Sequence, residues 1–288
     1  MSRNNHLGMK AKSAISNAVI YVILIIMSII WLIPFAGILL ESFRMESTGR
    51  AGYIIPKVWG LGNYINLWTK TSFPIWFRNT LIAGLAVAVL QTVIVLSVSY
   101  TLSRMRFNGR KLLMNCCLVL GMFPGFVTMI VLYKVLSGLG LTGPNAVPGL
   151  ILVYCASSGM GYYVSKGFFD TIPKSLDEAA RVDGATRAQV FYKVIMPLSK
   201  PIVIYTVLTA FMAPWGDFMF AKYIAHGTEA GMNVAVGLQY WISSKSLIDT
   251  NYTMFCAGGV CVALPVTILF MLLQKYYVEG VTGGAVKG

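Results

Sequence analysis

Six apolar runs, each long enough to cross a membrane, constrain the fold of this chain more than any motif. They cover about 17–40, 79–102, 112–135, 144–166, 201–224 and 252–276. A membrane-spanning helix needs about 20 apolar residues, and helices satisfy their own backbone hydrogen bonds in lipid. The runs therefore predict an all-α, polytopic membrane protein with six transmembrane helices. The first run is too long for a signal peptide and lacks a convincing cleavage site, so we expect it to stay as a helix.

Composition supports the membrane class. Hydrophobic residues make up 57% of the 288 residues and charged residues 11%, with a mean hydropathy of +0.70. The formal net charge of +13 would suggest nucleic acid in a soluble protein, but no basic soluble module is present. Basic loops facing anionic lipid explain the charge, so we expect membrane lipid and no nucleic acid as a partner.

The distribution of basic residues predicts the orientation. Of the 23 Lys and Arg residues, 15 lie in the amino terminus, in the 103–111 turn, around the polar segment 172–201 and near the carboxyl terminus. Because Lys and Arg accumulate in cytoplasmic loops, both termini and this polar segment are predicted to be cytoplasmic. The predicted organisation is a cytoplasmic amino terminus at 1–16, a six-helix domain at 17–276 and a cytoplasmic tail at 277–288.

The polar segment predicts two short helices joined by a tight turn. Ser175 and Glu178 have the spacing of a capping box, which predicts a helix starting near Leu176. Thr186 and Gln189 repeat that spacing for a second helix, expected to stop before Pro197. Between them, Gly184 stands where a left-handed residue would end the first helix. The segment 172–197 is therefore expected to form a compact helical hairpin.

Signatures of catalysis and metal binding are missing from the sequence. It has no phosphate-binding loop, no supported Ser/His/Asp or Cys/His set, and only two histidines. Its five cysteines all lie in apolar runs without C-x-x-C spacing, which indicates buried apolar residues rather than a metal site or disulfides. We expect a protein that is not an enzyme.

Asp217 is a charged residue within the fifth apolar run. It follows Pro201 by 16 positions, so at ~1.5 Å per residue it lies about 24 Å along the helix, in the outer third of a ~30 Å membrane core. A carboxylate at that depth is a candidate for a polar cavity, and Trp215 and Phe218 beside it offer aromatic faces for a sugar ring. The alternative is a structural carboxylate bonded to donors near a helix break at Pro214.

The polar segment resembles the EAA motif of membrane subunits of binding-protein-dependent ABC importers. Glu178-Ala179-Ala180, then Gly184 and Val194-Ile195-Met196-Pro197, reproduce the motif's spacing, with Val and Met where the family usually has Ile and Leu. The resemblance implies a type I ABC importer transmembrane fold. It also implies that the hairpin is a coupling element that contacts an ATP-hydrolysing subunit through Glu178, Ala179, Ala180, Asp183, Gly184 and Pro197.

Other segments resemble maltose-type sugar permeases in particular. These are Leu61-Gly62-Asn63-Tyr64, Arg78-Asn79-Thr80 and the carboxyl-terminal G-A-V-K-G. The resemblance implies the smaller permease subunit of a carbohydrate importer, whose tail contacts the ATPase through Gly284, Ala285, Val286 and Lys287. Gly216 departs from the Trp-Asn-Asp/Glu-Phe pattern that the family often carries around Asp217.

The resemblance also implies the partners and the substrate. The partners would be a second permease subunit, a dimer of ATP-binding subunits that holds ATP and Mg, and an extracytoplasmic solute-binding protein; no cofactor is expected on this chain. The solute would be a di- or oligosaccharide or a related sugar-derived solute, moved by alternating access across a bacterial cytoplasmic membrane. Tyr154, Trp215, Asp217 and Phe218 are candidates for its path.

Two alternatives remain open. One is an ABC importer for a non-sugar solute, and the other is an ion-coupled secondary transporter, which would need coupling carboxylates near the bilayer midplane. Glu178 likewise has two possible roles, as a helix cap and as an anion paired with an arginine of the ATPase.

Overall fold

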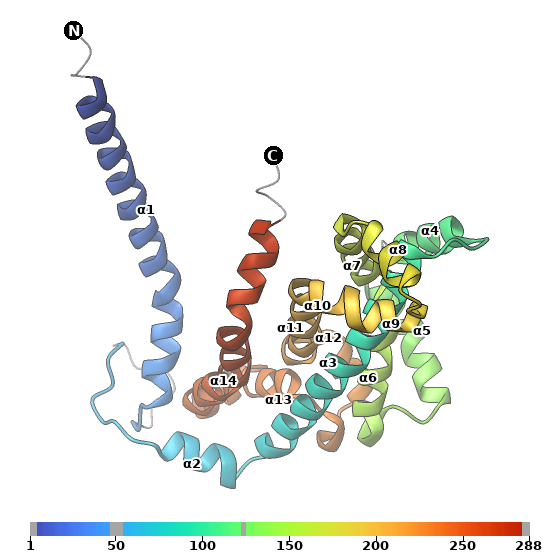
Figure 1. Cartoon of the computed structure of the whole chain (residues 1–288). Helices are drawn as coiled ribbons and strands as arrows, with labels where there is room; N and C mark the ends of the chain where they lie inside the picture. The colour runs from blue at the N-terminus through green and yellow to red at the C-terminus, as the bar shows by residue number, and fades with distance from the viewer. Residues whose placement is uncertain (1–4, 47–53, 122–124, 284–288) are drawn as a thin grey trace.

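The computed structural model describes residues 5–46, 54–121 and 125–283, and these form an all-helical structure without a strand. Three helices are much longer than the rest: α1 (Asn5–Ser42), α3 (Phe73–Arg104) and α14 (Lys245–Gly283). The start of α1, the end of α14 and the short helix α8 (Ser175–Val182) lie at one end of the molecule (Figure 1). The all-α prediction is confirmed.

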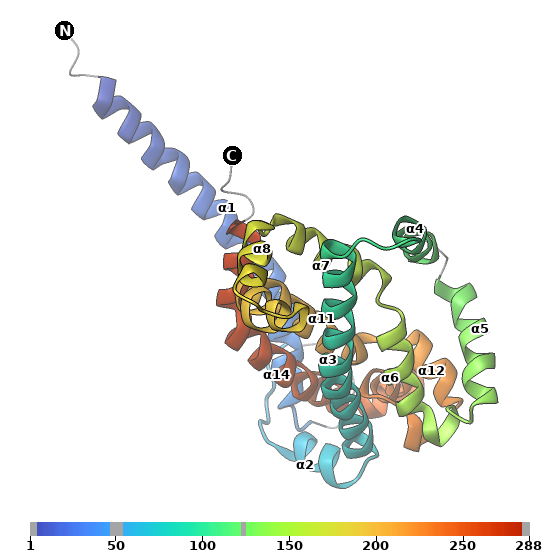
Figure 2. The same cartoon turned by 45° about the vertical axis from the view of Figure 1, so that its right-hand side comes forward.

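The remaining helices are short and mostly pack around α3. In chain order they are α2 (Gly62–Thr69), α4 (Arg110–Gly121), α5 (Gly125–Gly138), the 3-10 turn η1 (Gly143–Asn145), α6 (Ala146–Ala156), α7 (Gly159–Thr171), α9 (Arg187–Gln189), the π-helical segment η2 (Val190–Ile195), α10 (Met196–Leu198), α11 (Lys200–Gly216), α12 (Met219–Ala225), the 3-10 turn η3 (Glu229–Gly231) and α13 (Val234–Trp241). Figure 2 shows α3 at the centre, with α11 and α14 on one side and α5, α6 and α12 on the other.

Among the described residues, three helices are individually long and apolar enough to span a membrane: 12–42 in α1, α3 and 245–276 in α14. Two further pairs pass the same test only together, and both pairs are bent. Residues 127–138 and 143–156 meet at 107°, and Arg187–Leu198 meets Lys200–Gly216 at 84°. The described chain therefore has three such spans, or up to five if each bent pair counts as one.

Two of the predicted continuous spans are wrong in detail. The run at 144–166 breaks between α6 and α7, and the run at 201–224 breaks between α11 and α12. At the first break the Gln91 amide of α3 donates a hydrogen bond to Ser158 Oγ over 3.1 Å, and Ser158 Oγ donates to the Cys155 carbonyl over 2.8 Å. The Ser158 side chain thus supplies a hydrogen-bond partner for a backbone carbonyl at the break. The pattern of apolar residues in the sequence does not reveal such a break.

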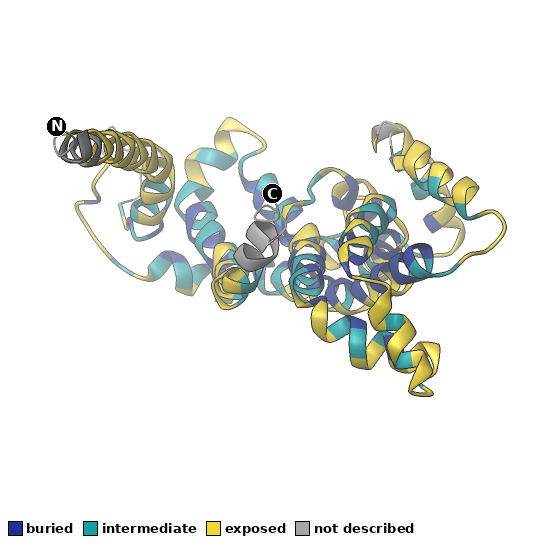
Figure 3. Ribbon diagram, turned by 45° about the horizontal axis from the view of Figure 1, so that its top comes forward, coloured by how far each residue is buried: buried dark blue, intermediate teal, exposed yellow. Residues whose placement is uncertain are grey.

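Helix α1 stands apart from the rest of the molecule. Its most apolar stretch buries none of its residues within the chain, and its side chains are exposed along most of the helix (Figure 3). Only its carboxyl-terminal part contacts α14. An apolar helix of this kind is stable only when lipid or another protein covers it.

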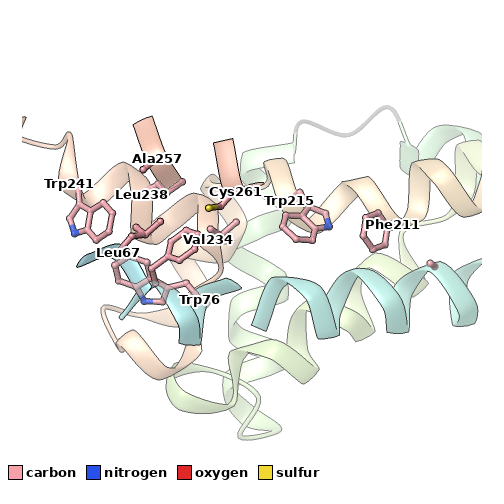
Figure 4. Close-up of a cluster of buried hydrophobic side chains, with 11 residues drawn as sticks. Leu67, Trp76, Phe211, Trp215, Val234, Leu238, Trp241, Ala257 and Cys261 are labelled. Atoms are coloured by element: carbon pink, nitrogen blue, oxygen red, sulfur yellow. The ribbon is translucent and has the colours of Figure 1, made fainter. Parts of the chain in front are cut away.

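The main core joins α3, α11, α13 and α14. Its buried members include Trp76 of α3, Phe211 and Trp215 of α11, and Leu238 of α13 (Figure 4). The ring centroids of Trp76 and Trp241 lie 5.4 Å apart. Helix α13 is short and was not predicted from the sequence, yet it contributes Val234, Leu238 and Trp241 to this core. It closes the end of the helix bundle opposite to α8 (Figure 1).

Gly237 provides a test of this packing. A Cβ atom at Gly237 would lie 2.0 Å from Cε3 of the buried Trp76 ring. We expect Gly237→Ala to destabilise the fold by about 1–3 kcal/mol because the ring must move. Thermal unfolding in detergent measures the loss. The matched control is Gly216→Ala, where nothing lies within 4 Å of the added atom; equal unfolding temperatures for the two variants would contradict the packing.

At the end opposite to α8, a buried arginine connects α1 to the loop that follows it. Arg44 is 1% exposed; its Nε donates to Glu41 Oε2 over 2.8 Å, and its Nη2 donates to the carbonyl of Ile54 over 3.1 Å. Glu46 Oε1 accepts hydrogen bonds from the backbone N–H groups of Lys57 and Val58. Burial acts to raise the pKa of Glu46, but these hydrogen bonds and Arg44 outweigh it and hold the pKa below its ordinary value of 4.5.

This lowered pKa predicts a pH dependence. A carboxyl group that is more acidic in the folded loop stabilises it at and above pH 4.5, and that contribution is lost as the pH falls below 4.5 through the folded pKa. We expect the hydrogen-exchange protection factors of the Lys57 and Val58 amides to fall in that range. In Glu46→Gln the side-chain amide oxygen still accepts hydrogen bonds but does not titrate. The protection factors of the Lys57 and Val58 amides in this variant should therefore be independent of pH. A wild-type loop with the same flat profile would contradict the assignment.

Candidate functional site

The hairpin begins with α8, whose start differs from the prediction. Ser175 is the first residue within the helix, and Lys174 before it already has helical dihedral angles. No side-chain cap forms, so the predicted Ser175–Glu178 capping box is wrong. The physical reason is that Leu176 and Glu178 donate their N–H groups to the carbonyls of Pro173 and Lys174, which starts the turn before Ser175 can act as a cap. Asp177 and Glu178 still lie in the first turn, where the helix dipole favours anions.

The turn after α8 has the predicted conformation. Gly184 has φ +84°, in the left-handed region. The N–H of Ala185 bonds to the Ala180 carbonyl over 2.9 Å, and that of Gly184 bonds to the Arg181 carbonyl over 3.1 Å. This is the hydrogen-bond pattern of a Schellman motif, which requires a left-handed residue after the helix cap. Gly184 therefore ends α8 and sets the direction of the next helix.

The second capping box is confirmed. Gln189 N–H donates to Thr186 Oγ1 over 3.3 Å, and Thr186 N–H donates to Gln189 Oε1 over 2.7 Å. The second helix then continues through the π segment η2 and α10, with Pro197 inside α10. The predicted stop before Pro197 is wrong. A π turn changes the hydrogen-bond register, so the missing N–H of Pro197 falls where a new helical turn begins.

The hairpin is anchored to the membrane helices by a buried apolar cluster, which includes residues of α3, α7, η2 and α11. Val190 and Ile195 of η2 are 1% and 0% exposed, and they pack with Tyr100 and Phe169. The ring centroid of Tyr100 lies 4.7 Å from that of Phe191 and 6.2 Å from that of Phe169. A packed interior transmits displacement because it has little free space, so a movement of the hairpin must move α3, α7 and α11 as well.

The opposite surface of the hairpin is exposed. Glu178, Ala179, Asp183, Gly184 and Pro197 are all exposed, whereas Ala180 is half-buried against the apolar cluster. The side chain of Glu178 has no hydrogen bond or ion pair with the described residues. Val182 is 87% exposed. The outer surface therefore combines free carboxylates with uncovered apolar side chains, as a protein-binding surface does.

We expect Gly184→Val to distort the turn at a cost of about 1–2 kcal/mol, because Val would have to adopt a left-handed conformation. Hydrogen exchange at the backbone amides of residue 184 and Ala185 should therefore be faster in the variant than in the wild type. Gly167→Val is the matched control: neither glycine has a neighbour within 4 Å of an added Cβ, but Gly167 has no positive φ. Unchanged exchange in both variants would exclude the turn described here.

Asp217 lies at the break between α11 and α12, where it satisfies polar groups of the helix ends. Its Oδ2 accepts a hydrogen bond from the Tyr154 hydroxyl over 2.5 Å, and its Oδ1 accepts from the Phe220 N–H over 3.1 Å. Asn233 Nδ2 donates to the carbonyls of Asp217 and Pro214 over 2.7 and 3.1 Å. This is the structural arrangement considered for Asp217 from the sequence. The role of Asn233 was missed, although an Asn directly before an apolar helical run is a recognisable N-cap signal.

The aromatic residues beside Asp217 are packed into the protein. Trp215 is 5% exposed, and its ring centroid lies 5.4 Å from that of Phe77 and 5.7 Å from that of Phe211. Phe218 is half-buried, with Lys222 Nζ 5.0 Å from its ring centroid. The structure thus brings Tyr154 and Asp217 together, while the Trp215 ring is enclosed in this conformation. A role for these four residues in a solute path stays a prediction.

The predicted tail contacts, Gly284, Ala285, Val286 and Lys287, lie outside the described residues. An ion pair beneath the hairpin was not predicted from the sequence: Arg104 Nε lies 3.1 Å from Asp177 Oδ2. Two opposite charges 73 positions apart carry no pairing signal in a single sequence.

Residues 94–283 match the family described as binding-protein-dependent transport system inner membrane component. This region contains the hairpin, its anchoring cluster and Asp217. The chain belongs to this family.

Two relatives and one solved structure agree with this assignment. The chain is 34% identical to the maltodextrin transport system permease protein MdxG of Bacillus subtilis strain 168, over 93% of this chain and 95% of the relative. It is 32% identical to the maltodextrin transport system permease protein MalD of Streptococcus pneumoniae, over 97% and 98%. A chain of a bacterial ABC transporter involved in the import of the polysaccharide alginate has the same fold, with a TM-score of 0.78 at 22% identity, covering 92% of this chain and 98% of that one.

Proposed function

We propose that this chain is a permease subunit of an ATP-driven importer and that its hairpin transmits movement from a separate ATP-hydrolysing subunit. The observation that carries the proposal is the two-sided hairpin: one surface is packed into α3, α7 and α11, and the other is exposed with an unpaired Glu178. The 84° bend between the second hairpin helix and α11 supports a hairpin that lies across the end of a membrane span. Closure of a partner beneath it would then move the spans as rigid bodies.

The proposed partners follow from the surfaces. A dimer of ATP-binding subunits, which would hold ATP and Mg, would contact the hairpin. A second permease subunit would cover part of α1, whose apolar stretch is unburied within this chain. An extracytoplasmic solute-binding protein would deliver the solute at the end formed by α2 and α13. Basic residues near the hairpin and both termini support a cytoplasmic location for the opposite end, which carries the hairpin, in a bacterial inner membrane.

The proposed solute is a di- or oligosaccharide, or a related sugar-derived compound. Support comes from two relatives whose names assign them to maltodextrin transport. In this proposal the membrane domain alternates between inward-facing and outward-facing conformations, and the energy comes from ATP hydrolysed on the partner.

The proposal is tested by isolating the tagged chain from native membranes in mild detergent. We expect an ATPase subunit and a second permease to co-purify, with ATP hydrolysis stimulated by a binding protein loaded with sugar. A chain that purifies without any ATPase would contradict the proposal and favour an ion-coupled carrier. Vesicle uptake that continues with a non-hydrolysable ATP analogue would do the same.

Glu178→Gln tests the docking surface. The amide keeps the shape of the side chain but removes the charge, so an ion pair with the partner would be lost. Helix α8 would lose only the interaction of that charge with its dipole, about 0.3–1 kcal/mol. A charge-assisted hydrogen bond contributes about 1.5–3 kcal/mol, and we expect the affinity for the ATPase subunit to fall roughly tenfold or more. Retention of that subunit at increasing dilution measures the change.

The matched control is Asp249→Asn, which removes an exposed carboxylate at the start of α14, far from the hairpin (Figure 1). We expect its ATPase retention to equal that of the wild type. If Glu178→Gln and Asp249→Asn retain the ATPase equally well, the ion-pair role of Glu178 is excluded, while the other contacts of the hairpin remain to be tested.

A further inference from the structure

A small basic pocket lies between the end of α3 and the inner side of the hairpin. Its volume is about 240 Å³, and the residues that line it include Tyr100, Arg104, Arg106, Asp177, Arg181 and Arg187. The four arginines come from four segments: Arg104 ends α3, Arg106 lies in the turn after it, Arg181 is in α8 and Arg187 begins α9. Sites for small-molecule ligands usually measure about 300–1,000 Å³, so this pocket fits a single small group.

The pocket contains a buried guanidinium with an unused donor. The Arg104 side chain is 5% exposed; its Nη2 donates to the Ile172 carbonyl over 2.8 Å, and its Nε lies 3.1 Å from Asp177 Oδ2. Its Nη1 is buried and makes no hydrogen bond with the described residues. A buried donor without a partner is costly, and a charged one more so. Asp177 Oδ1 is likewise buried without a hydrogen bond, so it does not satisfy Nη1. Nη1 is therefore a donor available to an acceptor on a ligand in the pocket.

Electrostatics defines the charge of that acceptor. Four arginines face one carboxylate, that of Asp177, which leaves an excess of positive charge. Burial raises the pKa of Asp177 and outweighs the opposing effect of Arg104; Glu178 raises it further, and Lys174 lowers it. The pocket is thus suited to an anion that several arginines can share.

The position of the pocket narrows the class of anion. Helix α3 is one of the three candidate spans and ends at Arg104, so the pocket lies at one end of a candidate span. Arginine forks bind phosphate oxygens in pairs, and basic pockets at the cytoplasmic ends of spans bind lipid phosphates. We infer that this pocket binds one phosphate group, which bridges the turn after α3 and both helices of the hairpin.

Phosphate binding at this pocket does not depend on docking of an ATPase. A phosphate bound to Arg104, Arg181 and Arg187 ties α8 and α9 to α3 on the polar side, opposite the contacts of Val190 and Ile195. The phosphate group has two sources, the headgroup of an anionic phospholipid and a free phosphate compound. Both present the same oxygens to the arginines.

The test is calorimetric titration of the purified full-length chain in detergent at constant ionic strength. The probes are inorganic phosphate, dihexanoyl-phosphatidylglycerol and, as a zwitterionic control, dihexanoyl-phosphatidylcholine. We expect saturable binding of phosphatidylglycerol or inorganic phosphate, and weaker binding of phosphatidylcholine. Binding of phosphatidylglycerol alone identifies the lipid source; comparable binding of inorganic phosphate identifies a free compound.

Variants locate the site. Arg181→Gln with Arg187→Gln removes two exposed arginines of the pocket, and we expect at least a tenfold loss of affinity. Lys193→Gln with Lys200→Gln removes the same charge from two exposed residues outside the pocket lining, and we expect little change. The inference is overturned if neither probe binds the wild type, if both double variants weaken binding equally, or if the two lipids bind equally well and independently of the arginines.

Discussion

Every backbone polar group that enters the hydrocarbon region must find a partner inside the protein, and this constraint determines where helices in this chain can end. The breaks between α6 and α7 and between α11 and α12 lie where side chains supply those partners. At the first break Ser158 does so, while Gln91 donates to the Ser158 hydroxyl. Asp217 and Asn233 do so at the second. The polar residues of these runs are thus structural elements, and their arrangement fixes the position of α12 and α13.

The same constraint explains which parts of the fold could be predicted from the sequence. Apolar runs identify the segments that enter lipid, since length and hydropathy decide that property. They do not show where a run is interrupted, because an interruption depends on a side chain such as Gln91, which comes from a different helix. Helix α13 was missed for a related reason: it is shorter than a span, and only its packing against Trp76 makes it part of the core.

Two of the three local signals in the hairpin were reliable. The Thr186–Gln189 box and the left-handed Gly184 depend on neighbours within a few residues, and both are as predicted. The Ser175–Glu178 box failed because Pro173 and Lys174 begin the helix earlier. Pro197 was misjudged because a π segment precedes it, and a single sequence does not reveal that change of register. For Asp217, the sequence identified the residue as a candidate. Its hydrogen bond from Tyr154 could not be predicted, because the two residues are 63 positions apart and only the fold brings them together.

Helix α1 has a consequence for how this chain tolerates substitution. Its apolar stretch is not buried against the rest of the protein, so apolar exchanges there leave the chain's own core unchanged. Selection on that stretch acts through membrane insertion and through whatever protein lies beside it. The side of α1 that is intolerant of apolar exchange would mark the direction of its neighbour. The pattern of tolerated substitutions around α1 would then show on which side of this helix the neighbouring protein lies.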